Sequence, residues 1–418
     1  MPGIQTLILY FSLFVSLFFE IFLLITYLEV RDEISFERAH TKDTLSHYPS
    51  VTILVPSYNE ELTVRATVES LLALNYPKDK LHLFLIDDGS RDKTLEVMNE
   101  FADNPQVRIF TKQNEGSKFA ALNYGLKHVT SDLVGCLDAD SFVDPEALMQ
   151  IVPYFDDATV QAVTPSIKVH EPKSILQHVQ KVEYSWGVFL RRMLSSINAL
   201  YVTPGPFSIF RRSVFKELGD YRHAHHTEDM ELALRMQKNR YKIVTALDAN
   251  VYTVTPDKLG GLVKQRTRWS YGFLNNAIDY RDMYFNRSYG HIGIFVLPIA
   301  TLSIFTTLYA ASNFVIASVK SALKYVRIHN ATGWGVPHHL PHFTFDWFYI
   351  NTSNVAIVST MTIAISLLLL GIAIKMSDGK LKIGKDIAYY LTLYIFIVPL
   401  WLAKALYNTA FRKSISWR

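Results

Sequence analysis

The sequence predicts an α/β domain built on a mainly parallel β-sheet and flanked on both sides by membrane-spanning helices. Three continuous apolar runs, at residues 51–55, 81–86 and 133–137, have the length and composition of buried strands. Amphipathic stretches of helical periodicity separate these runs, and strands that alternate with helices are typical of a parallel sheet. Long apolar segments lie before and after this region, whereas charged residues concentrate between positions 30 and 285.

The composition excludes several classes of function. The net charge is only +4 over 418 residues and no dense stripe of lysine and arginine is present, so nucleic acid is not an expected partner. Cys136 is the only cysteine, which excludes intrachain disulfides and cysteine-rich zinc sites. It lies in an apolar run, so we expect a buried strand thiol. The histidines at 223–226 and 338–342 are expected to be loop residues rather than zinc ligands.

The first apolar segment, residues 4–27, contains Glu20 as its only charged residue. About 20 apolar residues are enough to cross a bilayer. No basic residue precedes the segment and no small-residue cleavage site follows it, so we expect an anchor helix within residues 1–30 rather than a signal peptide. Glu20 is either a functional acid within the membrane or, as we expect, a residue of helix packing or of the membrane interface.

Three further apolar segments, at residues 291–319, 345–376 and 387–411, are each long enough to span a bilayer. They predict a C-terminal membrane region within residues 290–411 and bring the expected number of spans to four. The part between the two membrane regions, residues 45–285, is the expected soluble domain.

The distribution of basic residues predicts the orientation. Arginine and lysine follow the first span at residues 31–42 and none precedes it, so the positive-inside rule places the soluble domain in the cytoplasm, at the plasma membrane or an inner membrane. The lysines at 380–385 agree with this orientation. With four spans, the basic residues at 320–327 and 412–418 would face outward, which weakens the support that the positive-inside rule gives to this orientation.

Acidic residues follow two of the predicted strands. Asp87 and Asp88 end the second apolar run, and Asp138 and Asp140 follow the third. Ligands of open parallel sheets bind outside the carboxyl ends of the strands. Aspartates at strand ends are often helix caps, but two groups on one sheet edge favour a ligand site. Asp138 and Asp140 can direct oxygens to one point, and carboxylate oxygens are the ligands that Mg²⁺ or Mn²⁺ prefers.

A second group of polar residues lies further along the chain. Asp229 begins a predicted helix, whose dipole is expected to lower the pKa of its carboxyl. Gln265 and Arg268 share one helix face, with Trp269 adjoining. A guanidinium can grip a pyrophosphate with two hydrogen bonds, and an indole face can stack on a sugar ring. Alone, Asp229 would suit a structural helix cap, and an Arg-Trp pair on a basic helix is more often an interfacial anchor than a catalytic feature.

Two predicted helices of the soluble domain, residues 174–195 and 259–280, have an apolar face flanked by basic residues. This pattern is typical of helices that lie in the membrane interface. An ordinary surface helix packed on the sheet is the alternative.

Seven short motifs occur in order between residues 51 and 282. They are Val55-Pro56-Ser57-Tyr58-Asn59-Glu60, Asp87-Asp88-Gly89-Ser90, Lys118-Phe119-Ala120-Ala121-Leu122-Asn123, Asp138-Ala139-Asp140, Gly205-Pro206-Phe207-Ser208, Thr227-Glu228-Asp229 and Gln265-x-x-Arg268-Trp269. In this order and with flanking spans, the stretch resembles the family 2 glycosyltransferases. It is most similar to the membrane-embedded processive synthases of cellulose, chitin, hyaluronan and poly-N-acetylglucosamine. The resemblance implies a GT-A fold.

The resemblance also implies a role for each matching residue. Asp229 would be the general base that activates an acceptor hydroxyl, with Glu228 beside it in the catalytic motif. The residues expected to bind the donor nucleotide are Tyr58, Glu60, Asp87, Asp88, Lys118, Asp138 and Arg268. Those expected to bind the acceptor are Gly205, Gln265 and Trp269. The metal, Mg²⁺ or Mn²⁺, would be held by Asp138 and Asp140.

The function that these residues imply is sugar transfer, with inversion, from a UDP-sugar to a growing β-linked polysaccharide, which the protein's own spans could help to move. Single transfer to a lipid acceptor, as in ceramide glucosyltransferase-like enzymes, is the alternative, and a non-catalytic synthase subunit is a third hypothesis. Thr227-Glu228-Asp229 resembles cellulose-like and poly-N-acetylglucosamine-like synthases, whereas the motif at Gly205 resembles the chitin and hyaluronan branch, so the sugar stays open. Membrane lipids are expected partners; a homo-oligomer or an accessory subunit stays open.

Overall fold

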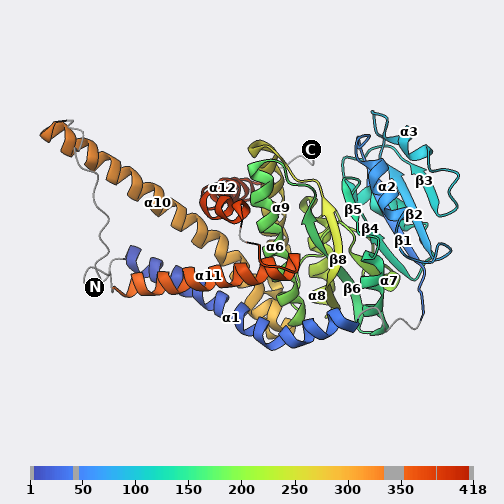
Figure 1. The fold of residues 1–418 in the computed structure, drawn as a ribbon, viewed down its shortest axis with the longest axis horizontal. Coiled ribbons are helices and arrows are strands. Elements are labelled where there is room, and N and C mark those ends of the chain that lie inside the picture. The colour runs from blue at the N-terminus through green and yellow to red at the C-terminus, as the bar shows by residue number, and fades with distance from the viewer. Residues whose placement is uncertain (1–3, 41–46, 334–352, 383, 414–418) are drawn as a thin grey trace.

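The computed structural model describes residues 4–40, 47–333, 353–382 and 384–413. A sheet-bearing domain lies at one end, and long helices extend from it at the other (Figure 1). The helices α6 (Ile175–Ser196) and α9 (Leu259–Asp279) lie between these two parts.

The sheet has eight strands in the order β3-β2-β1-β4-β7-β6-β8-β5. β1 pairs with β2 and β4 in parallel, β2 with β3 in parallel and β6 with β8 in parallel, while β7 and β5 add antiparallel pairings. The mainly parallel sheet is therefore confirmed. The strands are β1 (Val51–Ser57), β2 (Leu81–Asp87), β3 (Val107–Thr111), β4 (Leu133–Cys136), β5 (Ser141–Val143), β6 (Val160–Val169), β7 (Ile209–Arg211) and β8 (Lys242–Thr253).

The three predicted strands are apolar on both faces because helices cover both sides of the sheet. Ile53 and Leu83 pack in a core with α2 (Val64–Leu72), whereas Leu54 and Ile86 pack in another with α4 (Lys118–Leu126). Successive side chains of a strand point to opposite faces, so the continuous apolar runs supply both cores at once. The other helices of the domain are α3 (Thr94–Asn99), α5 (Ala147–Ile151), α7 (Arg212–Leu218) and α8 (Glu228–Lys238).

Helices α6 and α9 begin and end within one residue of the ranges that the amphipathic pattern predicts. Ser174 begins α6 with a capping box, in which its hydroxyl accepts from the Gln177 backbone N–H and the Gln177 side chain accepts in return. Their apolar faces pack against two C-terminal helices, α6 on α11 (Asn354–Asp378) and on α12 (Lys385–Ala410), and α9 on α12.

The described residues contain four helices that are long and apolar enough to cross a membrane: α1 (Ile4–His40), α10 (Leu297–Thr332, entered through a π-turn at Ile292–Val296), α11 and α12. α1 continues well beyond the expected boundary at residue 30, and its charged second half packs on the soluble domain through an Arg192–Glu37 ion pair of 3.0 Å. Part of the predicted third span, residues 345–352, lies outside the described residues. Glu20 accepts a hydrogen bond from Ser366 of α11, which fits the expected packing role.

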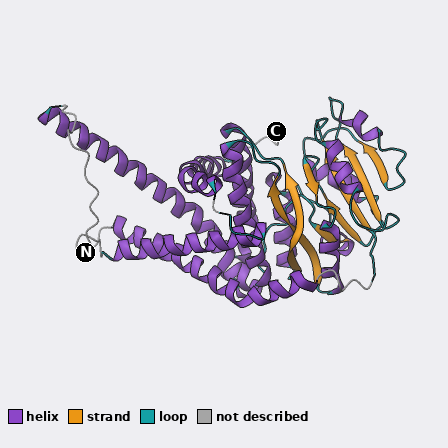
Figure 2. Cartoon of the chain, viewed as in Figure 1, coloured by secondary structure: helices purple, strands orange, loops and turns teal. Residues whose placement is uncertain are grey.

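Helix α12 differs from the other three in direction. It is seen along its axis in Figures 1 and 2, whereas α10 and α11 run across the view. Asp386, near its first residue, pairs with Lys181 of α6 at 2.9 Å. Near its last residue, the Thr409 hydroxyl accepts from the side-chain amide of Asn275 of α9 at 3.2 Å. Both ends of α12 are therefore held by helices of the soluble domain.

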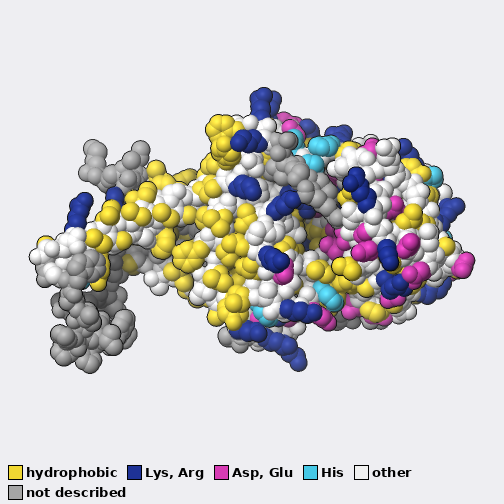
Figure 3. All heavy atoms as spheres, turned by 90° about the horizontal axis from the view of Figure 1, so that it is seen from above, with side chains coloured by type: hydrophobic (Ala, Val, Ile, Leu, Met, Phe, Trp, Pro, Cys, Tyr) yellow, Lys and Arg dark blue, Asp and Glu magenta, His cyan; other side chains and the backbone are white. Residues whose placement is uncertain are grey.

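The surface divides in the same way. Hydrophobic side chains gather over the helical part, and acidic side chains gather over the sheet-bearing domain (Figure 3). On the helical part, exposed apolar side chains such as Phe314 and Ile395 leave a surface that suits lipid rather than water.

Candidate functional site

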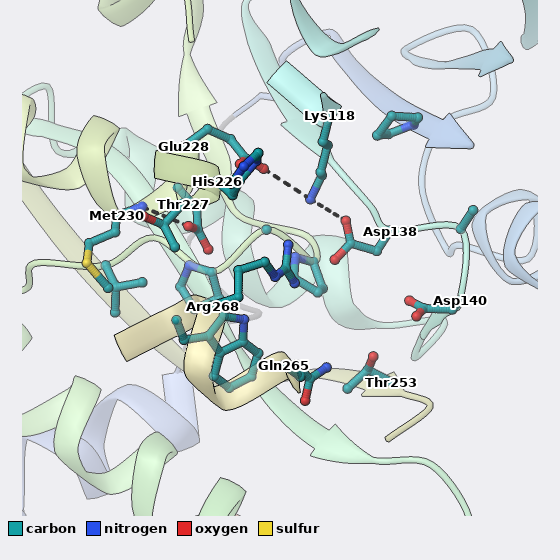
Figure 4. A pocket seen from close by; sticks show the side chains of 18 of the residues that line it. Lys118, Asp138, Asp140, His226, Thr227, Glu228, Met230, Thr253, Gln265 and Arg268 are labelled. Carbon is teal, nitrogen blue, oxygen red and sulfur yellow. Dashed lines mark hydrogen bonds and ion pairs between the residues drawn. The ribbon is translucent and has the colours of Figure 1, made fainter. Parts of the chain in front are cut away.

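A cavity of about 790 Å³ opens at the carboxyl ends of β1, β2 and β4, between the sheet and helices α6 and α9. The side chains that line it come from segments far apart in the sequence (Figure 4). Twelve predicted site residues line it: Tyr58, Glu60, Asp88, Lys118, Asp138, Asp140, Gly205, Glu228, Asp229, Gln265, Arg268 and Trp269.

The predicted residue outside the lining is Asp87. Its carboxylate accepts from the Ser90 backbone N–H at 3.2 Å and so holds the turn after β2. Asp88 instead faces the cavity and binds Lys112 Nζ at 2.8 Å, with both side chains less than 10% exposed. Burial raises the pKa of the Asp88 carboxyl, and Lys112 partly opposes this effect. Sequence analysis overlooked Lys112, which no motif contains.

Lys118 links the two acidic motifs. From the first turn of α4, its ammonium pairs with Asp138 and lies 3.5 Å from Glu228 (Figure 4). Burial alone would lower the pKa of Lys118, but these two carboxylates outweigh it and raise the pKa well above its ordinary value. Gly205 leaves the space that the ammonium occupies, since a Cβ there would lie 2.7 Å from Lys118 Nζ. Lys118 therefore stays charged and fixed.

Asp138 and Asp140 are the carboxylates that could hold a metal. Burial, together with Asp138 and Glu60, raises the pKa of Asp140 to about 7. A bound cation reduces the electrostatic repulsion between neighbouring carboxylates. Carboxylate oxygens are ligands that suit Mg²⁺ or Mn²⁺. The described residues contain no group of three or more side chains placed to ligate a metal, so a bound phosphate would have to complete the coordination shell.

Asp229 lies in the first turn of α8, where its carboxylate accepts from the Met230 backbone N–H at 2.8 Å. The sequence-based expectation of a lowered pKa is wrong in direction. Burial and the adjacent Glu228 raise the pKa of Asp229 to about 6, against the smaller opposing effects of Lys118 and Arg268. A carboxylate with this pKa is a better proton acceptor near neutral pH than an ordinary aspartate.

Helix α9 holds the turn that precedes Asp229. The Thr227 hydroxyl accepts from the side-chain amide of Asn276 at 2.9 Å and donates to the Ala224 carbonyl at 3.0 Å. Gly272 makes room for this contact, because a Cβ at that position would lie 2.3 Å from the Thr227 side chain. The helix that carries Gln265 and Trp269 is thereby joined to the motif at Thr227–Asp229. Gly272 and Asn276 were not found from sequence, since neither belongs to a motif.

Arg266 is a second residue that sequence reasoning missed, although it lies inside a motif. It is 3% exposed and forms two parallel hydrogen bonds of 2.9 Å with the carboxylate of Glu183 in α6. Its third nitrogen donates to Gln265 Oε1 at 2.8 Å, and its guanidinium carbon lies 4.0 Å from the centre of the Trp269 ring. Arg266 thus orients the two predicted acceptor residues, and its partly buried acidic partner lies 83 residues away in the chain.

The histidine turn at residues 223–226 borders the cavity. Ala224, His225 and His226 have positive φ angles of 39°, 53° and 66°, and His226 lines the cavity (Figure 4). His225 Nε2 lies 2.9 Å from Asp279 of α9. Residues 338–342 lie outside the described part of the chain.

Cys136 is buried at the end of β4, as predicted. Its thiol donates to the Gly205 carbonyl at 2.8 Å, and burial raises its pKa to about 12, which is unsuited to a nucleophile.

These strands, motifs and acids agree with one family. The sequence profile described as Glycosyltransferase like family 2 matches residues 49–272, more than half of the chain. The chain belongs to this glycosyltransferase family. Among curated relatives, a poly-β-1,6-N-acetyl-D-glucosamine synthase of Staphylococcus epidermidis is 29% identical over 261 residues, which is 62% of each chain. The synthase of the same description in Staphylococcus aureus is 32% identical over 224 residues, 53% of this chain and 54% of that one.

A mannosyltransferase of Pyrobaculum calidifontis, solved with GDP-Man and Mn²⁺, matches 94% of this chain and 99% of its own with a TM-score of 0.61. At 18% identity this likeness shows the fold, and it confirms the GT-A-like domain with flanking helices. The chain matches about 62% of the length of the first synthase.

Proposed function

We propose that the protein is a membrane glycosyltransferase that transfers a sugar, with inversion, from a UDP-sugar to a growing β-linked polysaccharide. The observation that carries this proposal is a single cavity that combines a partly buried acid of raised pKa with acids and cations suited to a nucleoside diphosphate. The synthase names of the relatives support a polymer as the product.

The donor would occupy the strand-end side of the cavity. Asp88 lies there directly after β2, where the nucleoside of a donor at the sheet edge is expected. The leaving diphosphate carries negative charge, which Lys118 and Arg268 would stabilise. Lys118 suits this task because Asp138 and Glu228 already fix its position.

Asp138 and Asp140 would hold a divalent cation against the diphosphate. The cation would neutralise negative charge on the diphosphate as it leaves. The mannosyltransferase solved with Mn²⁺ supports a divalent cation here and does not choose between Mn²⁺ and Mg²⁺. Because the raised pKa of Asp140 reflects mutual repulsion of acids as well as burial, a bound cation would favour the charged form of the Asp140 carboxylate.

Asp229 would remove the proton of the acceptor hydroxyl as that oxygen attacks the sugar opposite the diphosphate. Its pKa of about 6 keeps it ionised at neutral pH and still basic enough to accept a proton. Gln265 and the 37%-exposed Trp269 would hold the terminal sugar of the acceptor, in the orientation that Arg266 sets.

For the orientation in the membrane, we propose three crossings, made by α1, α10 and α11, with the catalytic domain in the cytoplasm. Helix α12 would lie in the membrane interface, since both of its ends contact domain helices. The basic residues Arg412 and Lys413 then lie on the cytoplasmic side with those at 380–385, which removes one conflict with the positive-inside rule. A C-terminal cysteine label that reacts only with external reagent in intact cells would contradict this arrangement.

The test of activity uses purified protein in nanodiscs with labelled UDP-glucose, UDP-N-acetylglucosamine and other UDP-sugars, plus Mg²⁺ or Mn²⁺. A labelled product of high mass supports polysaccharide synthesis, whereas labelled glycolipid alone would favour single transfer to lipid. No transfer from any donor would overturn the catalytic proposal.

A further inference from the structure

One stripe of α6 faces the cavity. Tyr184, Gly187 and Arg191, at spacings of three and four residues, all line it. Arg191 differs from Arg266, the paired arginine described above, in its hydrogen bonding. Its Nε and Nη2 atoms are buried and have no hydrogen-bond partner among the described residues. Arg266, by contrast, is paired with a carboxylate.

Two buried guanidinium nitrogens without partners are costly, because burial removes water from them and no group in the described part of the protein replaces that water. Burial lowers the pKa of Arg191 to about 10, and only the hydroxyls of Tyr184 and Tyr201 oppose this effect. Proteins retain buried charges when a partner of opposite sign arrives, as at binding and catalytic sites. The missing partner is therefore expected to be an anion brought by a ligand.

Arg191 has two tyrosine neighbours in the cavity, and one of them, Tyr184, is close enough to Asp140 for that acid to raise its pKa. The other neighbour, Tyr201, belongs to the segment that holds the base: two residues on, Thr203 donates to the Asp229 carbonyl at 2.8 Å. Tyr201 also packs against Phe273 of α9, with ring centres 5.8 Å apart. This position is on the acceptor side of the cavity.

Gly187 shapes the same place. A Cβ on Gly187 would lie 3.2 Å from Arg191 Nη1, closer than most such contacts, so the glycine leaves the guanidinium room beside the helix. Arginine presents several donors in a fixed fork, which matches a phosphate or a carboxylate better than a single hydroxyl.

We propose that Arg191 binds a negatively charged group of the acceptor substrate, either a lipid phosphate or a sugar carboxylate. This subsite rests on the proposed function, because it takes the acceptor of that reaction to enter beside Asp229. It narrows the substrate class to acceptors that carry an anion near the hydroxyl that is glycosylated.

The experiment measures binding rather than transfer, so that it stands apart from the test of activity. The full-length protein in nanodiscs is titrated, in the presence of UDP and Mn²⁺, with a polyprenyl phosphate, a hexuronate-terminated oligosaccharide and a neutral N-acetylglucosamine oligosaccharide. We expect one of the two anionic probes to bind at least about tenfold more tightly than the neutral one. The anion that does so identifies the source of the charge.

Arg191→Met should remove this tenfold preference and leave UDP binding unchanged, while Arg191→Lys should retain part of it. Because the substitution removes an unpaired buried charge, the Tm of the ligand-free protein should stay the same or rise. The matched control is Arg192→Met, at the next position of the helix, where an ion pair with Glu37 is lost. That variant should lower Tm and keep the preference for the anion.

Three results would each overturn the proposal: equal binding of the neutral and both anionic probes, an equal loss for all probes in Arg191→Met, or a clear fall in Tm for that variant. If transfer fails with every donor while the anion preference depends on Arg191, the proposed function is wrong and the anion site stands.

Discussion

Replacing Asp229 by asparagine removes the proposed base with almost no change of shape. The Met230 backbone N–H would still have an oxygen to bind, because an asparagine side chain keeps one carbonyl oxygen. Loss of a general base lowers kcat by about 10² to 10⁴, and the binding of UDP should persist because the donor side of the cavity is unchanged.

The same substitution should stabilise the ligand-free protein at alkaline pH. The pKa of Asp229 is about 6 in the folded protein, above its ordinary value of 3.8 by about two pKa units. Each unit corresponds to about 1.4 kcal/mol, so the ionised carboxylate lowers the free energy of unfolding by up to about 3 kcal/mol.

The direction in which the stability changes with pH depends on whether the folded or the unfolded state releases its proton first. As pH rises from about 4 to about 6, the unfolded chain loses its proton while the folded protein keeps it, so the wild type loses stability over this window. Above about pH 6 both states are ionised and the deficit is complete. An asparagine side chain does not titrate, so the advantage of Asp229→Asn should be absent at about pH 4 and full at about pH 8.

The assay combines transfer of labelled sugar, UDP affinity by calorimetry, and thermal unfolding at about pH 4, 6 and 8. Asp103→Asn, at an exposed loop position, is the matched control and should change none of these quantities. Near-normal turnover of Asp229→Asn would refute the base assignment. Lower stability than the wild type at the alkaline end of this range would refute the reasoning about burial and Glu228.

Three further predictions concern the same cavity. Gly205→Ala should reduce turnover by about 100-fold, because its Cβ would lie 2.7 Å from Lys118 Nζ, and Gly260→Ala, with no atom within 4 Å, should leave kcat unchanged. Arg266→Lys keeps the positive charge but loses the two parallel hydrogen bonds to Glu183. Initial rates should therefore show a higher KM for the acceptor and an unchanged KM for the donor. Removal of the divalent metal should abolish transfer. The affinity for Mn²⁺ should fall as the pH drops below about 7, because Asp140 then takes up a proton. An affinity that does not change with pH would contradict this prediction.

The parts of the fold that could be predicted are those with a strong local pattern. β1, β2 and β4 are continuous apolar runs, and α6 and α9 are long amphipathic helices. Each of these patterns can be recognised from a short stretch of sequence. β3 and the strands after β4 did not stand out. β5 and β7 have only three residues each, and β6 and β8 pair with register shifts that interrupt the alternation of side chains.

The motifs predicted the site residues in the same way, but not the partners that set their chemistry. The expected lowering of the Asp229 pKa used its helix position, which is local. The observed rise comes first from burial by neighbouring segments and then from the adjacent Glu228. Asp87 and Asp88 are adjacent and alike in sequence, yet one holds a turn and the other faces the cavity, because successive residues at a strand end point to opposite sides.

The sequence by itself therefore determined the family, three of the parallel strands with the acids that follow them, and the presence of apolar helices at both ends. Only the tertiary structure decided that α12 lies across the domain, that Arg266 is fixed by Glu183, and that the buried nitrogens of Arg191 have no partner among the described residues. The reason is physical: hydrophobic periodicity and motif spacing are properties of neighbouring residues, whereas burial, ion pairing and the direction of a helix depend on segments that meet only in the folded chain.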